Sequence, residues 1–273
     1  MADEDSAELR STLHKRHNVL AALATEPQTK PDLVDAIAPS RSTIDRAISA
    51  LEDAGCIERR DSTYYLTQLG RVSLAEHNRH TKTVDSIARA SDILDSVSTD
   101  VHIDPVFFSG VSAQTADPHA PESPLKDSIE ALKTTDRLVG LVPVILSVYI
   151  EALTDLIREH DIKAELLLHE NAFDSLLEHY QDQFGKIDIT DHIDFYVTDQ
   201  DLPYTLWITE HDESSRADIT VHENGGVRGV LMNDTPAALQ WVRDEFAEYL
   251  ETADPVTVDL IGSGESLDGG DFG

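Results

Sequence analysis

The sequence predicts a multidomain protein of mixed α+β and α/β class, with a small N-terminal domain and a larger C-terminal α/β domain. Two short amphipathic helices and a strand pair follow one another within residues 30–67. From residue 125 onward, helical periodicity alternates with short apolar runs, which is typical of α/β folds. Between these regions, residues 98–124 contain four prolines, which exclude a long helix. We therefore expect domains at 1–70 and 98–253, joined by a helical segment at 71–97 and followed by a tail at 254–273.

The N-terminal domain is expected to contain three helices. A first helix is predicted over residues 9–25, where Leu20 and Leu23 belong to its apolar side, and Glu26-Pro27 ends it. A second helix begins at Lys30 with Pro31 at its first turn, a position where the missing N–H costs nothing, and Ala38-Pro39 stops it. We expect the first helix to pack across the other two.

The third helix follows at once and has one apolar face. Ile44, Ile48 and Leu51 recur at i, i+4 and i+7. Ser42 with an acidic residue three positions later fits a capping box, and Ser40 is the alternative cap. Gly55 ends the helix, and residues 56–67 are predicted as strand, turn and strand. This order is a winged helix-turn-helix, and a purely structural three-helix domain is the alternative.

A winged helix-turn-helix indicates a DNA-binding transcription regulator. Residues 42–59 resemble the recognition-helix segment of bacterial and archaeal winged-helix regulators. Side chains of the third helix would donate to base edges or phosphates in the major groove, and the wing would hold the adjacent backbone or minor groove. The predicted groove residues are Arg41, Ser42, Thr43 and Arg46, and those of the wing are Arg59, Arg60, Ser62 and Thr63. Tyr64 and Tyr65 are interpreted as the wing's own core.

The net charge of −31 at first argues against a partner as anionic as DNA. The charge is unevenly distributed, however. Residues 1–90 hold 12 Lys/Arg and 14 Asp/Glu, whereas residues 91–273 hold 9 and 38. The predicted DNA-binding domain is thus nearly neutral. Such an acidic remainder resembles proteins of halophilic archaea, and an acidic protein from a low-salt organism is the alternative.

The segment 71–97 is expected to be mostly helical and to contribute to a homodimer. Val84, Ile87, Ser91 and Leu94 have the spacing of a short two-helix seam, although packing on the helix's own domain explains it equally well. A dimer is expected in either case, because paired recognition helices read two half-sites of double-stranded DNA. His77 and His80 lie one turn apart, and we interpret them as solvated side chains rather than metal ligands.

The C-terminal domain should contain several strands and helices after a short strand near residues 106–108. We expect helices over residues 124–133, 143–159, 171–184 and 235–252, the last capped by Thr235 with Pro236 following. Strands are predicted at residues 137–142, 163–168, 193–197, 204–209, 217–221 and 227–232. Asn224-Gly225 favours a tight hairpin between the last two. The Gly-rich tail at 254–273 is predicted to be disordered.

This C-terminal part resembles the effector domain of archaeal regulators related to the methanogenesis regulator FilR, over roughly residues 100–253. The motifs that carry the resemblance are Pro118-His-Ala-Pro121, Leu202-Pro-Tyr-Thr-Leu-Trp207, residues 225–234 and the helix from Ala237 to Tyr249. The resemblance implies a cytoplasmic regulator whose C-terminal domain senses a ligand or builds the oligomer.

A small-molecule effector is expected near the strand ends at Val142, Leu168 and Val197, because open α/β sheets tend to bind ligands there. The alternative is an interaction scaffold without an effector. The candidate ligand-binding residues are Arg137, Tyr204, Trp207 and Arg228.

The sequence gives no support for catalysis, a metal or a cofactor. It contains no Walker-type loop, dinucleotide-binding glycine motif or nucleophile elbow. The single cysteine, Cys56, is interpreted as a core residue; it excludes an internal disulfide, which favours a cytoplasmic protein. No apolar run is long enough to cross a membrane, and the acidic N-terminus lacks the layout of a signal peptide.

Overall fold

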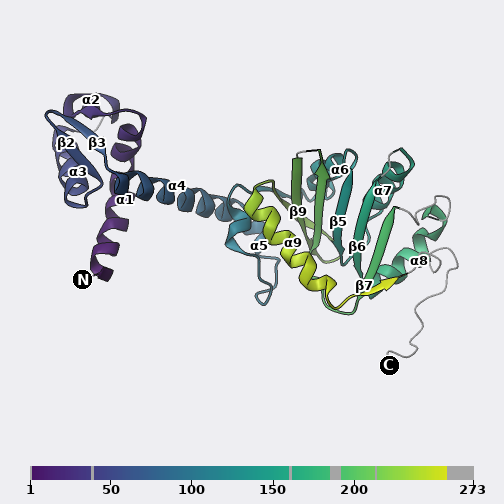
Figure 1. Cartoon of the computed structure of the whole chain (residues 1–273). Helices are drawn as coiled ribbons and strands as arrows, with labels where there is room; N and C mark the ends of the chain where they lie inside the picture. Colours follow the sequence, from purple (N-terminus) through teal and green to yellow (C-terminus); the bar gives the residue numbers. More distant parts are fainter. Residues whose placement is uncertain (1, 38–39, 160–161, 185–191, 213, 257–273) are drawn as a thin grey trace. The chain divides into compact units, whose positions relative to one another are not determined.

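The computed structural model describes residues 2–37, 40–159, 162–184, 192–212 and 214–256. The chain divides into two compact units, residues 1–82 and 83–273. The division falls inside one long helix, α4 (Gln68–Arg89) (Figure 1). We call residues 1–82 the N-terminal unit and residues 83–273 the C-terminal unit, and we describe each by itself.

The N-terminal unit has the element order that the sequence predicts, with one short strand added. It contains α1 (Ala2–Thr25), β1 (Gln28–Thr29), α2 (Lys30–Ile37), α3 (Arg41–Asp53), β2 (Ile57–Arg60) and β3 (Thr63–Leu66). The strands form an antiparallel sheet in the order β1-β3-β2. The added strand β1 joins the helices to the β2–β3 hairpin, because Gln28 and Thr29 pair with Tyr64 and Thr63.

One apolar core holds the N-terminal unit together. Leu20 of α1 and Leu33 of α2 are fully buried in it, together with Leu51 of α3. This confirms that the first helix packs across the other two. Cys56 is buried in the same core, as predicted, and burial raises the pKa of its thiol. At Gly70, a Cβ would lie 2.0 Å from the Cys56 carbonyl oxygen, so the start of α4 approaches the hairpin too closely for any side chain.

Helix α4 is followed by the short helix α5 (Ser91–Leu94). Of the residues in the predicted seam, Ile87 and Leu94 pack against the core of the C-terminal unit, while Val84 is 47% exposed. The apolar spacing at these two positions is thus used for packing within the unit itself.

The C-terminal unit is built on an eight-stranded mixed sheet in the order β11-β7-β6-β5-β8-β9-β10-β4. The neighbouring strands β5, β6 and β7 are parallel to one another, and every other pair is antiparallel. The strands are β4 (Ser112–Thr115), β5 (Arg137–Val142), β6 (Lys163–His169), β7 (Ile193–Thr198), β8 (Thr205–His211), β9 (Ser214–Glu223), β10 (Gly226–Asn233) and β11 (Asp254–Val256).

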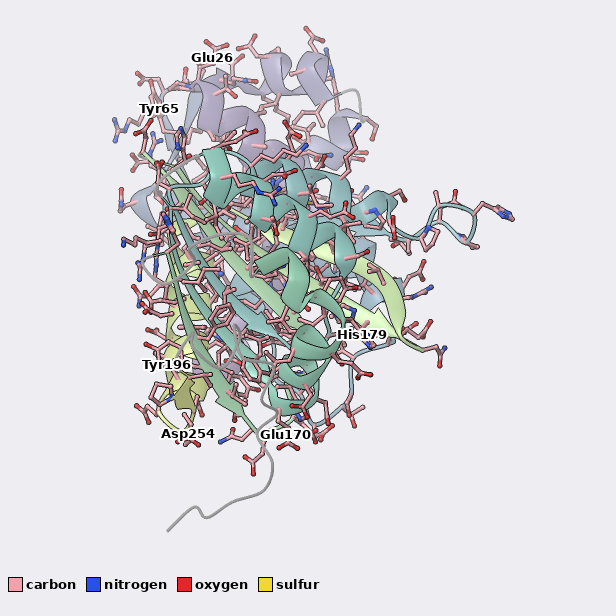
Figure 2. All side chains as sticks on the ribbon, turned by 90° about the vertical axis from the view of Figure 1, so that its right-hand side faces the viewer. Glu26, Tyr65, Glu170, His179, Tyr196 and Asp254 are labelled. Carbon is pink, nitrogen blue, oxygen red and sulfur yellow. The ribbon has the colours of Figure 1, made fainter. Side chains whose placement is uncertain are left out.

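Helices cover both faces of this sheet, which explains why its central strands are almost continuously apolar. One face carries α6 (Lys126–Leu132), α7 (Ser147–Glu159) and α8 (Glu170–Phe184). The other carries α5, the 3-10 turn η1 (Pro105–Phe108) and α9 (Pro236–Leu250) (Figure 1). A second 3-10 turn, η2 (Ser123–Leu125), precedes α6. In an edge-on view, Tyr196 of β7 and His179 of α8 lie on opposite sides of the sheet (Figure 2).

Most predicted elements are confirmed, and three predictions were wrong. Residues 105–108 form a 3-10 turn instead of a strand, because Asp104 accepts from the Val106 N–H at 2.7 Å and Pro105 follows it. The helix expected from Pro143 begins only at Ser147. Residues 254–256 form the edge strand β11, although a disordered tail was predicted; residues 257–273 lie outside the described part of the chain. Within that part, no helix is long and apolar enough to span a bilayer.

Candidate nucleic-acid interface

Helix α3 presents a polar face because its opposite face is anchored in the core. Ile44, Ala47, Ile48 and Leu51 are buried, which fixes the rotation of the helix about its axis. Arg41, Ser42 and Arg46 are exposed as a result, and Thr43 is half-buried. All four predicted groove residues therefore lie on the solvent side of the first two turns of one helix.

The start of α3 is fixed by its cap, which is Ser40 rather than Ser42. The Ser40 backbone is extended, and its Oγ accepts from the Thr43 N–H at 3.3 Å. The same Oγ lies 2.9 Å from Ser42 Oγ and 3.0 Å from Thr43 Oγ1. Arg46 donates from Nε to the Ser42 carbonyl oxygen at 3.2 Å. The Arg46 guanidinium is thereby held over the first turn of α3.

One acidic side chain interrupts this polar face, and a basic residue of α2 compensates it. Asp45 forms an ion pair with Lys30, whose side chain is 43% exposed. Sequence reasoning did not assign a role to Lys30. No local spacing could have indicated the pair, because the two residues lie on different helices and meet only after folding.

The β2–β3 hairpin holds the predicted wing residues. Asp61 has a φ of 55°, so the turn passes through the left-handed region, and its carbonyl oxygen accepts from Arg59 Nε at 2.7 Å. The Arg59 guanidinium lies 5.9 Å from the centre of the Tyr64 ring. That of Arg60 lies 4.9 Å from the Tyr65 ring and also pairs with Glu58.

These contacts orient both wing arginines along the hairpin while leaving them exposed. Tyr64 is buried and packs in the core. Tyr65 is half-buried, and the Arg60 guanidinium lies over its ring. Ser62 is exposed in the turn, and Thr63 is half-buried at the start of β3. Since α3 contacts β2, the helix and the hairpin that hold these two sets of residues pack against each other.

The structure does not bring the four candidate ligand residues of the C-terminal unit together. Arg137 forms ion pairs with Glu165 and Glu210. The fully buried Tyr204 donates its hydroxyl to Glu245 at 2.9 Å. Arg228 donates from Nε to the Asp92 carbonyl oxygen at 2.9 Å, and so ties α5 to β10.

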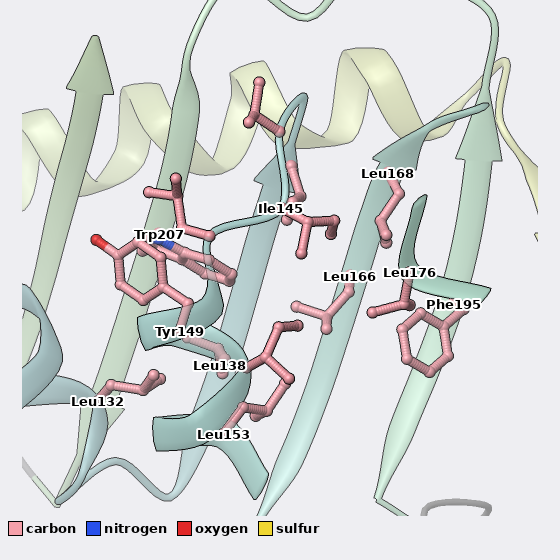
Figure 3. Close-up of a pocket in the computed structure, with 14 residues that line it drawn as sticks. Leu132, Leu138, Ile145, Tyr149, Leu153, Leu166, Leu168, Leu176, Phe195 and Trp207 are labelled. Atoms are coloured by element: carbon pink, nitrogen blue, oxygen red, sulfur yellow. The ribbon is translucent and has the colours of Figure 1, made fainter. Parts of the chain in front are cut away.

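Of the four, Trp207 lines a small apolar cavity under α7 (Figure 3). Val142 and Leu168 line this cavity too, at strand ends where the sequence predicts a ligand cleft. Among the described residues, no group of three or more His, Cys, Asp or Glu side chains has a geometry that would hold a metal ion.

Comparison with solved structures gives distant likenesses. TrmBL2, described as an archaeal chromatin protein with a novel mode of DNA binding, is 13% identical, with 91% of this chain and 98% of that chain covered and a TM-score of 0.40. NucT from Helicobacter pylori is 11% identical, with 54% and 98% covered and a TM-score of 0.40. Nuc, a phospholipase D family member from Salmonella typhimurium, is 9% identical, with 54% and 99% covered and a TM-score of 0.38. TM-scores below 0.5 do not establish a shared fold.

Comparison at the level of sequence is more specific. No curated protein matches the chain. Residues 4–89 match the family model of the HVO_A0261 N-terminal domain. Residues 121–252 match the model of the middle domain of the methanogenesis regulatory protein FilR1, which confirms the FilR-related resemblance over most of the C-terminal unit.

Proposed function

We propose that this chain is a DNA-binding transcription regulator, with a winged-helix N-terminal unit that binds double-stranded DNA as a homodimer in the cytoplasm. The observation that carries the proposal is the polar face of α3, which is capped by Ser40 and presents Arg41, Ser42, Thr43 and Arg46 opposite a fully buried face. The match of residues 121–252 to a domain of a methanogenesis regulatory protein supports a regulatory rather than a catalytic role.

In this proposal α3 enters the major groove and the hairpin follows the adjacent backbone. Arg46, held over the first turn of α3, would donate to a base edge or a phosphate, as would Arg41. Arg59 and Arg60, oriented by tyrosine rings, would contact the phosphates beside the groove. The ion pair of Lys30 with Asp45 lowers the repulsion that this acidic side chain would exert on DNA.

The test is a titration of genomic fragments selected by the wild-type protein, measured by gel shift at a fixed salt concentration. We expect Arg46→Ala and Arg60→Ala each to weaken binding by about 1–3 kcal/mol, or roughly 5- to 150-fold. Arg158→Ala is the matched control, because this exposed arginine lies in α7 of the C-terminal unit and its ion pair within the described part of the chain is with Asp155, three residues away. Unchanged binding by both test variants would overturn the assignment of the interface.

We further propose that the C-terminal unit modulates DNA binding through a small-molecule effector. Val142 and Leu168 lie at strand ends where open α/β sheets tend to bind ligands, which supports an effector over a pure dimerisation or docking scaffold. A thermal-shift screen against neutral metabolites separates the two: a saturable rise in melting temperature supports an effector, and no rise across the panel supports the scaffold.

A further inference from the structure

Four histidines lie where α1 and α4 meet within the N-terminal unit. His14 and His17 are three residues apart on α1, and His77 and His80 are three residues apart on α4. Residues with this spacing share one face of a helix, so each helix presents two imidazoles at the contact. The centre of the His77 ring lies 5.4 Å from that of His17 and 6.2 Å from that of His14. His80 lines the same groove as His14 and His77.

A hydrogen bond attaches α1 to α4 whatever the protonation state of its histidine. His17 Nε2 lies 2.7 Å from the Asn78 side-chain oxygen Oδ1. An amide oxygen only accepts, so His17 donates this bond, and it can do so as a neutral or as a protonated imidazole. The sensitivity of this contact to protons must therefore come from the other members of the cluster, and above all from His77.

The half-buried His77 has no acidic partner to compensate a positive charge. The titratable and charged side chains around it are Arg10, His14 and His17 of α1 and Glu76 and His80 of α4. Among the described residues, Glu76 forms its ion pair with Arg79, and no carboxylate pairs with His77. Burial lowers the pKa of His77 below its usual 6.5, and the imidazoles of His17, His14 and His80 lower it further.

The fold therefore favours the neutral form of His77. Because its pKa is lower in the folded state, the folded unit holds this proton less tightly than the unfolded chain does. The contribution to stability is full above pH 6.5 and is lost as the pH falls through the lowered folded pKa. The neighbouring imidazoles take up protons in the same range, so cations would gather at ring distances where like charges repel.

The first half of α1 is the part that such repulsion can move. Residues 5–11 are exposed or half-buried, whereas Val19, Leu20 and Leu23 further along the same helix are buried in the core. Segments with few buried apolar contacts open locally at a lower cost in free energy than core segments do. Repulsion at the cluster should thus separate residues 5–17 from α4 and leave the rest of α1 packed.

We propose that the four histidines form a proton-sensitive contact, which joins α1 to α4 while the imidazoles are neutral and releases the first half of α1 when they are protonated. Helix α4 continues from the N-terminal unit into the C-terminal unit, so the release acts on the helix that connects the two. This inference goes beyond the proposed DNA binding and does not require it.

The first experiment measures the titration of His77 by NMR in the full-length protein, labelled with carbon-13 at the histidine Cε1 atoms, at a fixed salt concentration. Between about pH 8 and pH 5 we expect a midpoint below 6.5 for the resonance that His77→Gln removes. His14→Asn takes away one neighbouring imidazole and should raise this midpoint toward 6.5. His119→Asn, at an exposed position in the C-terminal unit, is the matched control and should leave the midpoint unchanged.

The second experiment follows α1 by hydrogen exchange and mass spectrometry, with exchange times corrected for the intrinsic effect of pH. Between about pH 7.5 and pH 5.5, protection of residues 5–17 should fall several-fold in the wild type, while that of residues 19–23 persists. His77→Gln cannot take up the proton and should lose this dependence on pH. Should it not fold, His14→Asn decides, because the smaller cluster of this exposed-site variant should lose less protection at pH 5.5. A His77 midpoint at or above 6.5, or equal protection of residues 5–17 at both pH values, would overturn the proposal.

Discussion

At the scale of single residues, the buried carboxylate of Asp218 depends on the Arg216 guanidinium to compensate its charge. The Asp218 side chain is 2% exposed, and Arg216 donates to both of its oxygens, from Nε at 2.7 Å and from a terminal nitrogen at 2.6 Å. Arg216 also donates to the Asp127 carbonyl oxygen at 2.9 Å and so ties α6 to β9. A buried carboxylate is tolerated only while such a partner remains.

We therefore expect Arg216→Met to lower the free energy of unfolding by about 3 kcal/mol, at the low end of the range for broken buried pairs because the arginine is 27% exposed. Arg216→Met combined with Asp218→Leu should recover most of this loss, because no buried charge is then left unpaired. Urea unfolding followed by tryptophan fluorescence measures the effect, since both tryptophans lie in the C-terminal unit. A double variant as unstable as the single one would contradict the explanation.

Ionisation of Glu245 makes the stability of the C-terminal unit depend on pH. Burial raises the pKa of Glu245 above its usual value, against the opposing effect of the Tyr204 hydroxyl. The folded state therefore holds this proton more tightly than the unfolded state. The contribution of Glu245 to stability is full below its unfolded pKa and is lost as the pH rises through the raised folded pKa.

Glu245→Gln should remove this loss, because the amide oxygen still accepts from Tyr204 and cannot ionise. We expect the melting temperature of the variant to exceed that of the wild type at pH 7 and to approach it near pH 4. Calorimetry between pH 4 and pH 8 makes the comparison. Glu251→Gln, at the exposed end of α9, is the control and should follow the wild-type curve. A constant difference at all pH values would show that ionisation is not the cause.

At the scale of elements, α5 packs closely against the sheet at Gly229. A Cβ at Gly229 of β10 would lie 2.6 Å from the Ile93 side chain and 2.7 Å from the Gln114 carbonyl oxygen of β4. The register of β10 shifts between Val227 and Gly229, which places Arg228 where it donates to the Asp92 carbonyl oxygen. Because Gly229 has no side chain, α5 and the edge strand β4 can both pack closely against β10 at this position.

Gly229→Ala should destabilise the C-terminal unit by about 1–3 kcal/mol, since the added methyl group overpacks both neighbours. Gly226→Ala is the matched control: its Cβ would meet only the Glu223 carbonyl oxygen, at an ordinary 3.7 Å. Urea unfolding followed by tryptophan fluorescence distinguishes the two variants. Hydrogen exchange should in addition show faster opening of residues 91–94 in Gly229→Ala alone. Equal stability of the two variants would mean that the Ile93 side chain moves aside without a cost in the free energy of unfolding.

The predictions that succeeded rest on local patterns. The apolar register of α3 and the Asn224-Gly225 turn, where both residues have positive φ, follow from neighbouring residues alone. The edge strands β4 and β11 escaped prediction, because they join the sheet through backbone pairing and have little apolar alternation. The apolar residues 144–146 fit the pattern of a helix face, which is why the sequence predicts a helix from Pro143. In the structure they have no regular secondary structure and line a small cavity, so α7 begins only at Ser147.

For the candidate sites, too, local sequence predicts the residues on one element but not their partners from other elements. The groove and wing residues could be proposed from the sequence, because each set lies on one short element. The partners that hold them, Lys30 for Asp45 and Tyr65 for Arg60, appear only in the folded structure. The same limit applies to Arg137, which is paired with Glu210 from 73 residues away.

At the scale of the whole molecule, the two units differ most in charge. Residues 1–82 hold 11 Lys/Arg and 13 Asp/Glu, whereas residues 83–273 hold 10 and 39. Self-repulsion therefore acts almost entirely on the C-terminal unit, and added salt should screen it. In molar salt, counterion release would contribute little to DNA binding, so the N-terminal unit would depend on direct contacts such as those of Arg46 and Arg60.

We expect the two units to respond differently to potassium chloride between about 0.1 and 3 M, where the screening length falls from roughly 10 Å to below 3 Å. Tryptophan fluorescence reports only on the C-terminal unit, while ellipticity at 222 nm reports on helices of both. The fluorescence melting temperature should rise steeply with salt, and at low salt a second, less salt-dependent transition should remain in the ellipticity. A chain fully folded in dilute buffer, with one transition at all salt concentrations, would contradict adaptation to high salt and favour an acidic protein from a low-salt cell.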